Sequence, residues 1–328
     1  MALPTAPLLP DRQLQDRQLQ DRAAPVRPPR VRPAPEGGRR RLLVILNPTA
    51  GRRRRRRFRA TLDRLAALGC AVTLKETRAA GEASALARAA DPAAFDGVVA
   101  AGGDGTINEV INGLIGIDLP LALLPLGTAN VLAAEIGLGL APDTVARSIV
   151  EGPQRRIACG RAGRRHFTQM AGVGFDAHVV ENVDLALKRR IGKGAYVVEA
   201  LRQAFRFGFP TYRVTADGET FTAASVIVAK GRHYAGRYLL APEASIEAPV
   251  FQVCLFDRGG PLAVARYGLA LQTGGLPRRR DLRRIPARRV TIDGPLGDPV
   301  QGDGDTIARL PVEISIVPDA VDLVFAKG

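Results

Sequence analysis

The sequence predicts an α/β fold followed by a mostly β fold: a doubly wound parallel-sheet domain, then an antiparallel β-sandwich-like domain, with a cleft between them. First, short apolar runs alternate with helix-like segments up to about residue 150, which indicates a parallel sheet covered by helices. Second, short β-like runs with one helical stretch follow Gly152-Pro153. Third, Asp217-Gly218 lies between two of these runs and is typical of a hairpin turn.

The composition is that of a globular, strongly basic protein. Of the 328 residues 46% are hydrophobic, which is ample for two packed cores. The chain has 47 lysine and arginine residues against 32 aspartate and glutamate residues, so its net charge is +15. This charge favours an anionic partner, such as a membrane surface, a nucleotide or nucleic acid. Nucleic acid is the least favoured, because the chain has no tryptophan and its five tyrosines are scattered.

Cysteine usage and hydropathy predict a cytoplasmic location. Cys70, Cys159 and Cys254 lie far apart in apolar segments without the spacing of a disulfide framework or metal site, so we expect buried, reduced thiols. No apolar run approaches the roughly 18 residues of a transmembrane helix. Residues 1–10 also lack the basic start and long apolar core of a signal peptide.

We divide the chain into three parts. Residues 1–40 contain a five-residue repeat over 11–22 and a Pro/Arg-rich run, and we expect them to form a disordered basic tail. Residues 41–152 are the predicted α/β domain. Residues 153–328 are the predicted β-rich domain, with a helical excursion over about 179–206. The last segment of the chain either stays in that domain or returns to the first.

The α/β domain begins with the apolar strand Leu42–Leu46 and a loop that starts at Asn47-Pro48. This loop is either a plain Asn-Pro turn or a ligand loop. A helix over about 53–68 follows, and the six arginines Arg52 to Arg57 open it, either as a solvated face or as a contact for phosphate groups. A second strand over 71–74, the dipeptide Glu76-Thr77 and an alanine-rich helix over 79–90 come next.

The loop Gly102-Gly103-Asp104-Gly105 connects a strand over 96–101 to a helix with apolar residues at 107, 110, 111 and 114. Free N–H groups at the start of such a helix, together with its dipole, favour phosphate oxygens. Asp104 would repel a phosphate unless it holds Mg²⁺, takes a proton or orients a hydroxyl, so it indicates phosphoryl transfer. The alternative is an ordinary turn with an aspartate near the helix start.

A third loop, Pro125-Leu126-Gly127-Thr128-Ala129-Asn130, follows the buried strand over 119–124. Gly127 permits close backbone approach, and we expect Thr128 to cap the next helix and to offer a hydroxyl to phosphate or metal-bound water.

These strings resemble the diacylglycerol kinase catalytic-domain superfamily, which is a family of lipid kinases. The resemblance lies in Gly102 to Thr106 followed by Asn108-Glu109-Val110 and Asn112-Gly113, and it extends over about residues 42–325. The soluble bacterial branch, with sphingosine and ceramide kinases, is also similar over further strings: Asn47 to Gly51, Pro125 to Asn130, Ala171 to Ala177, Ala241 to Ala244 and Val300 to Asp305.

The resemblance implies ATP and Mg²⁺ as cofactors, a nucleotide in the first domain and a lipid in the second. Its nucleotide-binding positions are Asn47, Thr77, Gly102, Gly103, Asp104, Gly105, Thr106, Glu109, Gly127 and Thr128. It implies Asp305 as the catalytic base and Asp303 as its support or as a metal ligand, whereas the sphingosine kinase branch implies Asp104 as the base. A nucleotide-associated Mg²⁺ would contact Asp104 and Asp303.

The chain also departs from the family. Val131 and Lys230 replace an aspartate and an asparagine, and Asp305 replaces a glutamate. Bacterial relatives hold a structural Mg²⁺ near residues 247–249, where Ala248 cannot be a ligand, so we expect that site to be absent. Asp176 in Gly-Val-Gly-Phe-Asp is expected to cap a helix rather than to catalyse.

The sequence therefore predicts an ATP-dependent lipid kinase whose acceptor is a lipid hydroxyl, such as that of diacylglycerol, a sphingoid base or ceramide. An NAD kinase and a non-catalytic lipid- or nucleotide-binding homologue are the alternatives. We expect peripheral attachment to anionic membranes through Arg52 to Arg57 and a second cluster at Arg278, Arg279, Arg280, Arg283, Arg284, Arg288 and Arg289. A homodimer is left open.

Overall fold

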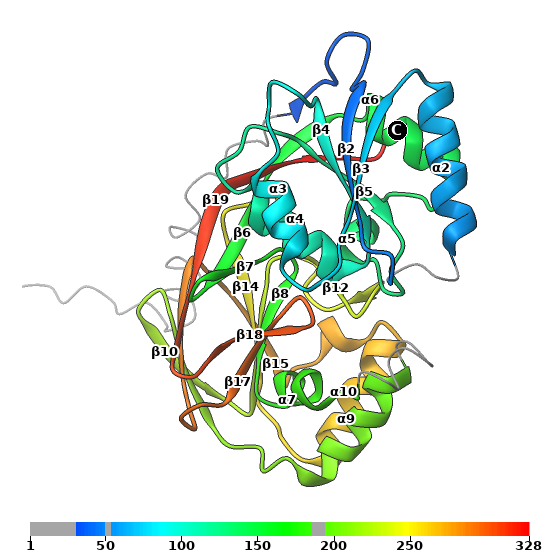
Figure 1. Ribbon diagram of the computed structural model, residues 1–328. Coiled ribbons are helices and arrows are strands. Elements are labelled where there is room, and N and C mark those ends of the chain that lie inside the picture. Colours follow the sequence, from blue (N-terminus) through cyan, green and yellow to red (C-terminus); the bar gives the residue numbers. More distant parts are fainter. Residues whose placement is uncertain (1–30, 50–53, 185–193, 328) are drawn as a thin grey trace, which may run out of the picture.

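The computed structural model describes residues 31–49, 54–184 and 194–327, which form two halves joined by one large sheet (Figure 1). The N-terminal half is the predicted doubly wound domain. Its four parallel strands have the order β3-β2-β4-β5. They are β2 (Arg41–Leu46), β3 (Ala71–Glu76), β4 (Gly97–Gly102) and β5 (Leu121–Pro125).

Helices cover both faces of these strands, because β2, β4 and β5 are apolar on both sides. One face packs against α2 (Arg55–Ala67) and α6 (Pro142–Glu151), and the other packs against α3 (Glu82–Arg88) and α4 (Asp104–Leu114) (Figure 1). The buried stripe of α4 consists of Ile107, Val110, Ile111 and Leu114, as its periodicity predicts.

The long last strand, β19 (Val312–Val324), runs from the C-terminal half into the N-terminal sheet (Figure 1). Its Leu323 is in parallel register with Leu121 of β5, while most of its length pairs with β6 (Gln154–Ala162) and β16 (Arg289–Asp293) in antiparallel fashion. The last strand therefore joins the two halves in a sheet of eleven strands, and the chain ends beside α6 (Figure 1).

The C-terminal half is an antiparallel sandwich, as predicted. Its second sheet has the order β15-β14-β11-β8-β17-β18 and packs against β9, β16 and β19 around buried residues such as Phe167, Tyr212 and Phe251. The other strands of this half are β7 (Arg165–Phe167), β8 (Met170–Val173), β9 (Tyr212–Ala216), β10 (Glu219–Ala223), β11 (Ser225–Ala229), β14 (Phe251–Phe256), β15 (Leu282–Ala287), β17 (Pro299–Gly302), β18 (Asp305–Arg309) and the separate pair β12 (His233–Tyr234) and β13 (Tyr238–Leu239).

Two boundaries differ from the prediction. One of the β-like runs predicted after Gly152-Pro153 spans residues 222–229, and it divides at Ala224, whose N–H donates to the Phe256 carbonyl, so β10 and β11 belong to different sheets. Asp217-Gly218 does form the predicted hairpin turn between β9 and β10. The helical excursion starts earlier than predicted, with α7 (Phe175–Asn182), and continues in α9 (Gly194–Arg206). A further helix, α10 (Pro261–Gln272), was not predicted.

Residues 31–40, which were predicted to belong to a disordered tail, are instead ordered against the fold. Val31–Arg32 forms β1, which pairs with β6. Arg39 is fully buried and donates to the carbonyls of Ile149 and Gly152 at 3.2 and 3.0 Å. Burial lowers the pKa of this guanidinium to about 10. The repeat over 11–22 lies outside the described residues.

The three cysteines are free thiols. Cys159 and Cys254 are buried as expected, and burial raises the pKa of each thiol to about 12. Cys70 is only half-buried, because it lies directly before the edge strand β3.

Candidate active site

The glycine loop lies where β4 ends and α4 begins. A side chain at Gly102 would collide with Thr106, since a Cβ there would lie 2.5 Å from the Thr106 Cβ. Gly103 is the N-cap of α4 and no side chain caps the helix. The first turn of α4 therefore offers N–H groups and the positive end of a helix dipole.

The loop after β5 packs directly on the glycine loop. The Leu126 N–H donates to the Gly102 carbonyl at 2.8 Å, and a Cβ on Gly127 would lie only 2.6 Å from the Gly103 Cα. The Asp104 carboxylate accepts the N–H groups of Asn130 and Val131 at 2.9 and 2.6 Å. Asp104 thus binds the start of α5 (Val131–Glu135) and holds the two loops together.

The predicted capping role of Thr128 is wrong. The N-cap of α5 is Asn130, which has a positive φ of 49°, and Asp104 supplies the acceptor that Thr128 was expected to supply. Thr128 is exposed instead. Its hydroxyl therefore faces solvent beside the glycine loop.

The loops after β2 and β3 reach the same edge of the sheet. The Asn47 side-chain amide donates to the Thr106 hydroxyl at 3.1 Å, and its carbonyl oxygen accepts from Thr49. The Thr77 N–H donates to the Leu46 carbonyl at 2.8 Å. Because the carboxyl ends of parallel strands meet at one edge, the four loops form the crevice in which open α/β sheets bind ligands.

Glu109 lies on α4 and contacts the helix that follows the loop after β3. Its carboxylate accepts the Ala83 N–H at 3.2 Å and so ties α4 to the first turn of α3. Glu109 therefore has a structural contact, and its contact with a nucleotide stays a prediction. A glutamate at the N-terminus of a helix is stabilising there because of the helix dipole.

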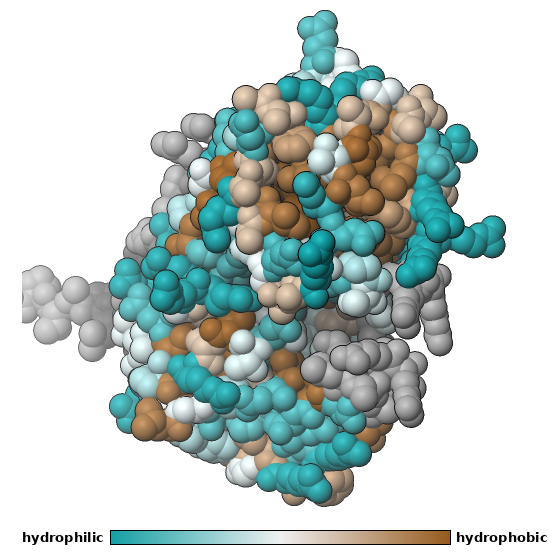
Figure 2. Space-filling view, viewed as in Figure 1, coloured by the Kyte–Doolittle hydropathy of each residue, from teal (hydrophilic) through white to brown (hydrophobic). Residues whose placement is uncertain are grey.

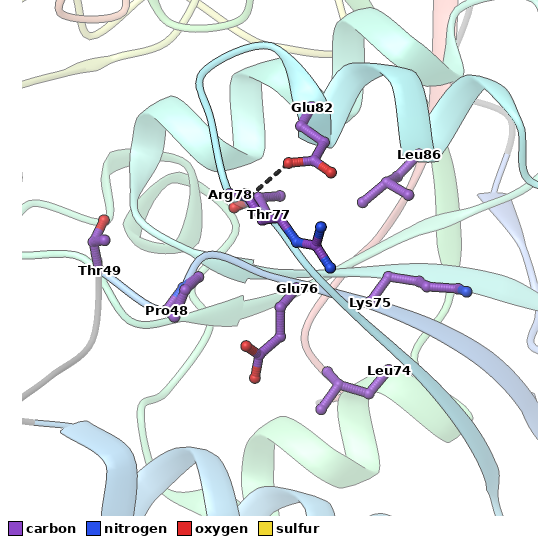
Figure 3. A pocket seen from close by; sticks show the side chains of 9 residues that line it. All are labelled: Pro48, Thr49, Leu74, Lys75, Glu76, Thr77, Arg78, Glu82 and Leu86. Carbon is purple, nitrogen blue, oxygen red and sulfur yellow. Dashed lines mark hydrogen bonds between the residues drawn. The ribbon is translucent and has the colours of Figure 1, made fainter.

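A cavity of about 630 Å³ opens beside Asn47 and Thr77 (Figure 3). Lys75, Glu76 and Arg78 from the end of β3 line it together with Glu82 and Leu86 of α3. Figure 2 shows hydrophobic residues exposed in the same upper half of the molecule, between α2 and α3. The lining comes from the N-terminal half alone, so a cleft between the domains stays a prediction.

Asp305 comes from the other half of the protein and lies over the glycine loop. The hairpin between β17 and β18 turns at Asp303 and Gly304, with φ values of 50° and 93°. This turn places the Asp305 carboxylate 3.7 Å from the position that a Cβ on Gly105 would occupy. Asp305 is exposed. The structure therefore brings together two predicted residues that lie 200 positions apart in the sequence.

Asp303 is the centre of a hydrogen-bond network rather than a free ligand. Its carboxylate accepts five hydrogen bonds at 2.7 to 3.0 Å, from the Asn108 side chain, the Thr168 hydroxyl and the N–H groups of Thr168, Gln169 and Met170. A carboxylate offers about four lone-pair positions, so none is left for a metal ion. Burial raises the pKa of Asp303, and these bonds oppose the shift. The expectation of metal binding there is corrected accordingly.

Two asparagines of α4, which the sequence marks only through the family resemblance, hold the halves together. Asn108 binds Asp303, and Asn112 exchanges hydrogen bonds with the backbone of His166 at 3.1 and 2.9 Å. The four-residue spacing places both on one helical face. Polar residues at that spacing on an otherwise buried helix were the signal that could have revealed this contact.

Asp176 does not cap α7 as expected, because Gly174 is the N-cap. Its buried carboxylate accepts from the Tyr234 hydroxyl and from the Gln301 amide, the latter at 2.7 Å. Gln301 in turn accepts the Gly304 N–H at 3.0 Å. Burial raises the pKa of Asp176. The network supports the hairpin that carries Asp305.

No group of three or more His, Cys, Asp or Glu residues suited to a metal ion occurs in the described parts of the chain. Near the position of the relatives' structural Mg²⁺, Lys230 is fully buried and its amine donates to the Ser245 carbonyl. Glu247 forms an ion pair with Arg155 at 3.2 Å.

Comparisons with known proteins agree with this geometry. Residues 41–162 match the family described as diacylglycerol kinase catalytic domain, and residues 169–325 match the YegS C-terminal NAD kinase beta sandwich-like domain. A Chromohalobacter salexigens protein named "Probable lipid kinase YegS-like" is 31% identical over 82% of this chain and 89% of its own. The diacylglycerol kinase of Bacillus subtilis is 27% identical over 84% and 92%.

The fold is also that of a solved structure. A diacylglycerol kinase from Bacillus anthracis superposes with a TM-score of 0.70 over 88% of this chain and 97% of its own, at 20% identity. From the motifs, the converging loops and these matches together, we conclude that the chain belongs to the diacylglycerol kinase catalytic-domain family of lipid kinases.

Proposed function

We propose that the protein transfers the γ-phosphoryl group of ATP to the hydroxyl of a membrane lipid, with diacylglycerol, a sphingoid base or ceramide as the substrate class. One observation carries the proposal. The exposed carboxylate of Asp305 lies beside Gly105, at the uncapped start of α4 on which three further strand-end loops converge. Phosphoryl transfer needs mainly such positioning and neutralisation of charge.

The residues present fit ATP. The backbone contact of Gly103 and Gly127 and the free first turn of α4 suit a triphosphate, since both loops lack the side chains that would block close approach. The neighbouring cavity of about 630 Å³ has the size and mixed lining expected for a base and ribose. ATP with Mg²⁺ would supply the phosphoryl group and most of the metal ligands.

Asp305 is our candidate for the group that accepts the proton of the lipid hydroxyl. Within the described part of the chain it forms no ion pair, and both oxygens of Asp104 already accept backbone N–H groups. Asp104 therefore acts as a positioning residue for the two loops. The shorter side chain of Asp305, relative to the family's glutamate, matches its position directly on the turn.

The proposal is tested with purified protein, radiolabelled ATP and Mg²⁺ against a panel of dispersed lipids, with NAD as a further acceptor. A labelled lipid is expected for one class of the panel, and its identity names the substrate. Label in NADP would instead make the protein an NAD kinase. Absence of label in every acceptor, with ATP binding retained, would make it a non-catalytic homologue.

A further inference from the structure

The outward face of α9 is apolar, which is unusual for a surface helix. Val197, Leu201 and Phe205 recur at every fourth position and are 59%, 62% and 80% exposed. They therefore form one stripe along the helix. Arg202 and Arg206 are exposed beside this stripe. A helix with an exposed apolar face flanked by arginines is typical of one that lies in a membrane interface.

A basic pocket lies beside the neighbouring helix α10. It has a volume of about 460 Å³ and is lined by Arg258, Arg278, Arg279, Arg280 and Asp281. Asp281 pairs with Arg279 at 2.8 Å and with Arg258 at 3.8 Å. For Arg278 and Arg280 no acidic partner lies within 4 Å among the residues that the structure describes. The pocket therefore has an excess of positive charge with unused donors.

The stripe and the pocket belong to one end of the molecule. Helices α9 and α10 lie side by side in the lower half, remote from the parallel strands (Figure 1). The backbone of Gly259, next to Arg258, packs on the ring of Phe209, which closely follows α9 in the chain. Leu262 and Leu269 of α10 are also exposed, at 64% and 65%.

This end connects to the candidate active site. α9 packs on α7, which carries Asp176 and contacts β17 and β18, the strands of the Asp305 hairpin. A lipid that leaves the bilayer beside α9 would therefore enter the half of the protein that holds Asp305.

The structure also separates the arginines of the second predicted cluster. Arg283, Arg284 and Arg289 are engaged with Asp257, Glu243 and Glu313, at 2.6, 3.1 and 3.5 Å. Ion pairs of this kind reduce the charge available to a membrane. The cluster as a whole is therefore less suited to docking than Arg278 and Arg280 together with the apolar stripe.

We propose that the outward face of α9 and the arginine pocket beside α10 dock the protein onto an anionic phospholipid surface. The apolar side chains would enter the acyl boundary and the guanidinium groups would bind lipid phosphates. A second copy of the chain is a poorer occupant, because a two-fold contact would bring the same arginines against each other. The inference rests on the proposed function in one respect only: a lipid kinase needs to reach a substrate in the bilayer, and docking would give it that access.

The test is co-sedimentation of the full chain with vesicles of phosphatidylcholine, with and without phosphatidylglycerol, at low and high salt. We expect binding only to the anionic vesicles. Arg278→Ser/Arg280→Ser should weaken it about thirtyfold, since each basic residue contributes about 1 kcal/mol at such a surface. Leu201→Ser/Phe205→Ser should weaken it at least about tenfold, because two apolar side chains leave the interface.

Two matched controls make the result specific. Arg55→Ser/Arg56→Ser removes the same charge from exposed positions of α2, and Leu296→Ser removes another exposed leucine. Both should bind like the wild type, because the proposed face does not include the arginines of α2 through which the sequence predicted attachment. The inference fails if the α2 variant loses binding and the pocket variant does not. It also fails if the α9 variant binds vesicles normally but changes from dimer to monomer on gel filtration.

The outcome is independent of catalysis. If the protein binds anionic vesicles through α9 but labels no lipid, only the proposed function is contradicted. If it labels dispersed lipid but binds vesicles through another surface, only the proposed docking face is contradicted.

Discussion

Asp104, Asp303 and Asp305 each have a glycine neighbour in the sequence, yet the structure gives them three different tasks. Asp104 accepts two backbone N–H groups of α5, Asp303 accepts five hydrogen bonds, and Asp305 is exposed over the glycine loop. Sequence alone could nominate all three carboxylates. It could not separate them, because the donors come from distant segments.

Asp303→Ala should lower the free energy of unfolding by about 2 to 4 kcal/mol, because it leaves enclosed donors without an acceptor. Asp305→Ala should change it by less than about 0.5 kcal/mol, since Asp305 is exposed. Urea unfolding of both variants checks this pair. Equal losses would show that Asp303 is not the structural carboxylate.

Lys230 should make stability depend on pH. Burial lowers the pKa of its amine to about 7, against an ordinary value of 10.5. Between these values the unfolded chain binds the extra proton, so this group makes the free energy of unfolding rise with pH, by up to about 1.4 kcal/mol per unit.

Lys230→Met removes this dependence. The stability of the variant relative to the wild type should therefore be greatest at and below pH 7 and should fall by about 2 kcal/mol between pH 7 and pH 9. Urea unfolding at the two pH values measures the difference. A constant difference would mean that Lys230 keeps its ordinary pKa in the folded protein.

At the scale of elements, the hydrophobic pattern of the sequence predicted strands and helices correctly where a whole strand, or one whole face of a helix, is buried in the same core. The parallel strands and the apolar face of α4 are examples. The prediction failed where contacts with a distant segment determine which sheet a residue joins or whether it is ordered. Residues 222–229 divide between two sheets, and β1 and Arg39 are ordered by contacts with β6 and α6, which lie more than 100 residues away.

The contact between the glycine loop and the loop after β5 gives a prediction at this scale. Gly127→Ala should raise the KM for ATP at least about tenfold, because its Cβ would meet the Gly103 backbone and separate the loops. Gly268→Ala is the control, since nothing lies within 4 Å of a Cβ there. Steady-state kinetics with varied ATP decide the matter, and an unchanged KM in Gly127→Ala would show that the loop contact is irrelevant to nucleotide binding.

For the molecule as a whole, the motifs in the sequence predicted the two halves, but not how tightly they are joined. β19 contributes Ile314 to the sandwich core and Leu323 to the core of the parallel strands. Asn108 and Asn112 add hydrogen bonds from α4 to the C-terminal half. The candidate site depends on this junction, since Asp305 and Gly105 come from opposite halves.

We therefore expect the two halves to unfold together. Differential scanning calorimetry should show one transition whose calorimetric and van't Hoff enthalpies agree. Two resolved transitions would mean that the shared strand does not couple the halves.

The most direct measurement of the central claim is the rate of phosphoryl transfer from ATP to the accepted lipid by Asp305→Asn. The amide keeps the size of the side chain but cannot take a proton, so kcat should fall at least about a hundredfold with little change in the KM for ATP. Asp118→Asn is the matched control, because Asp118 is an exposed carboxylate at the opposite, amino-terminal end of β5, and it should keep the wild-type rate. Wild-type turnover by Asp305→Asn would contradict the account.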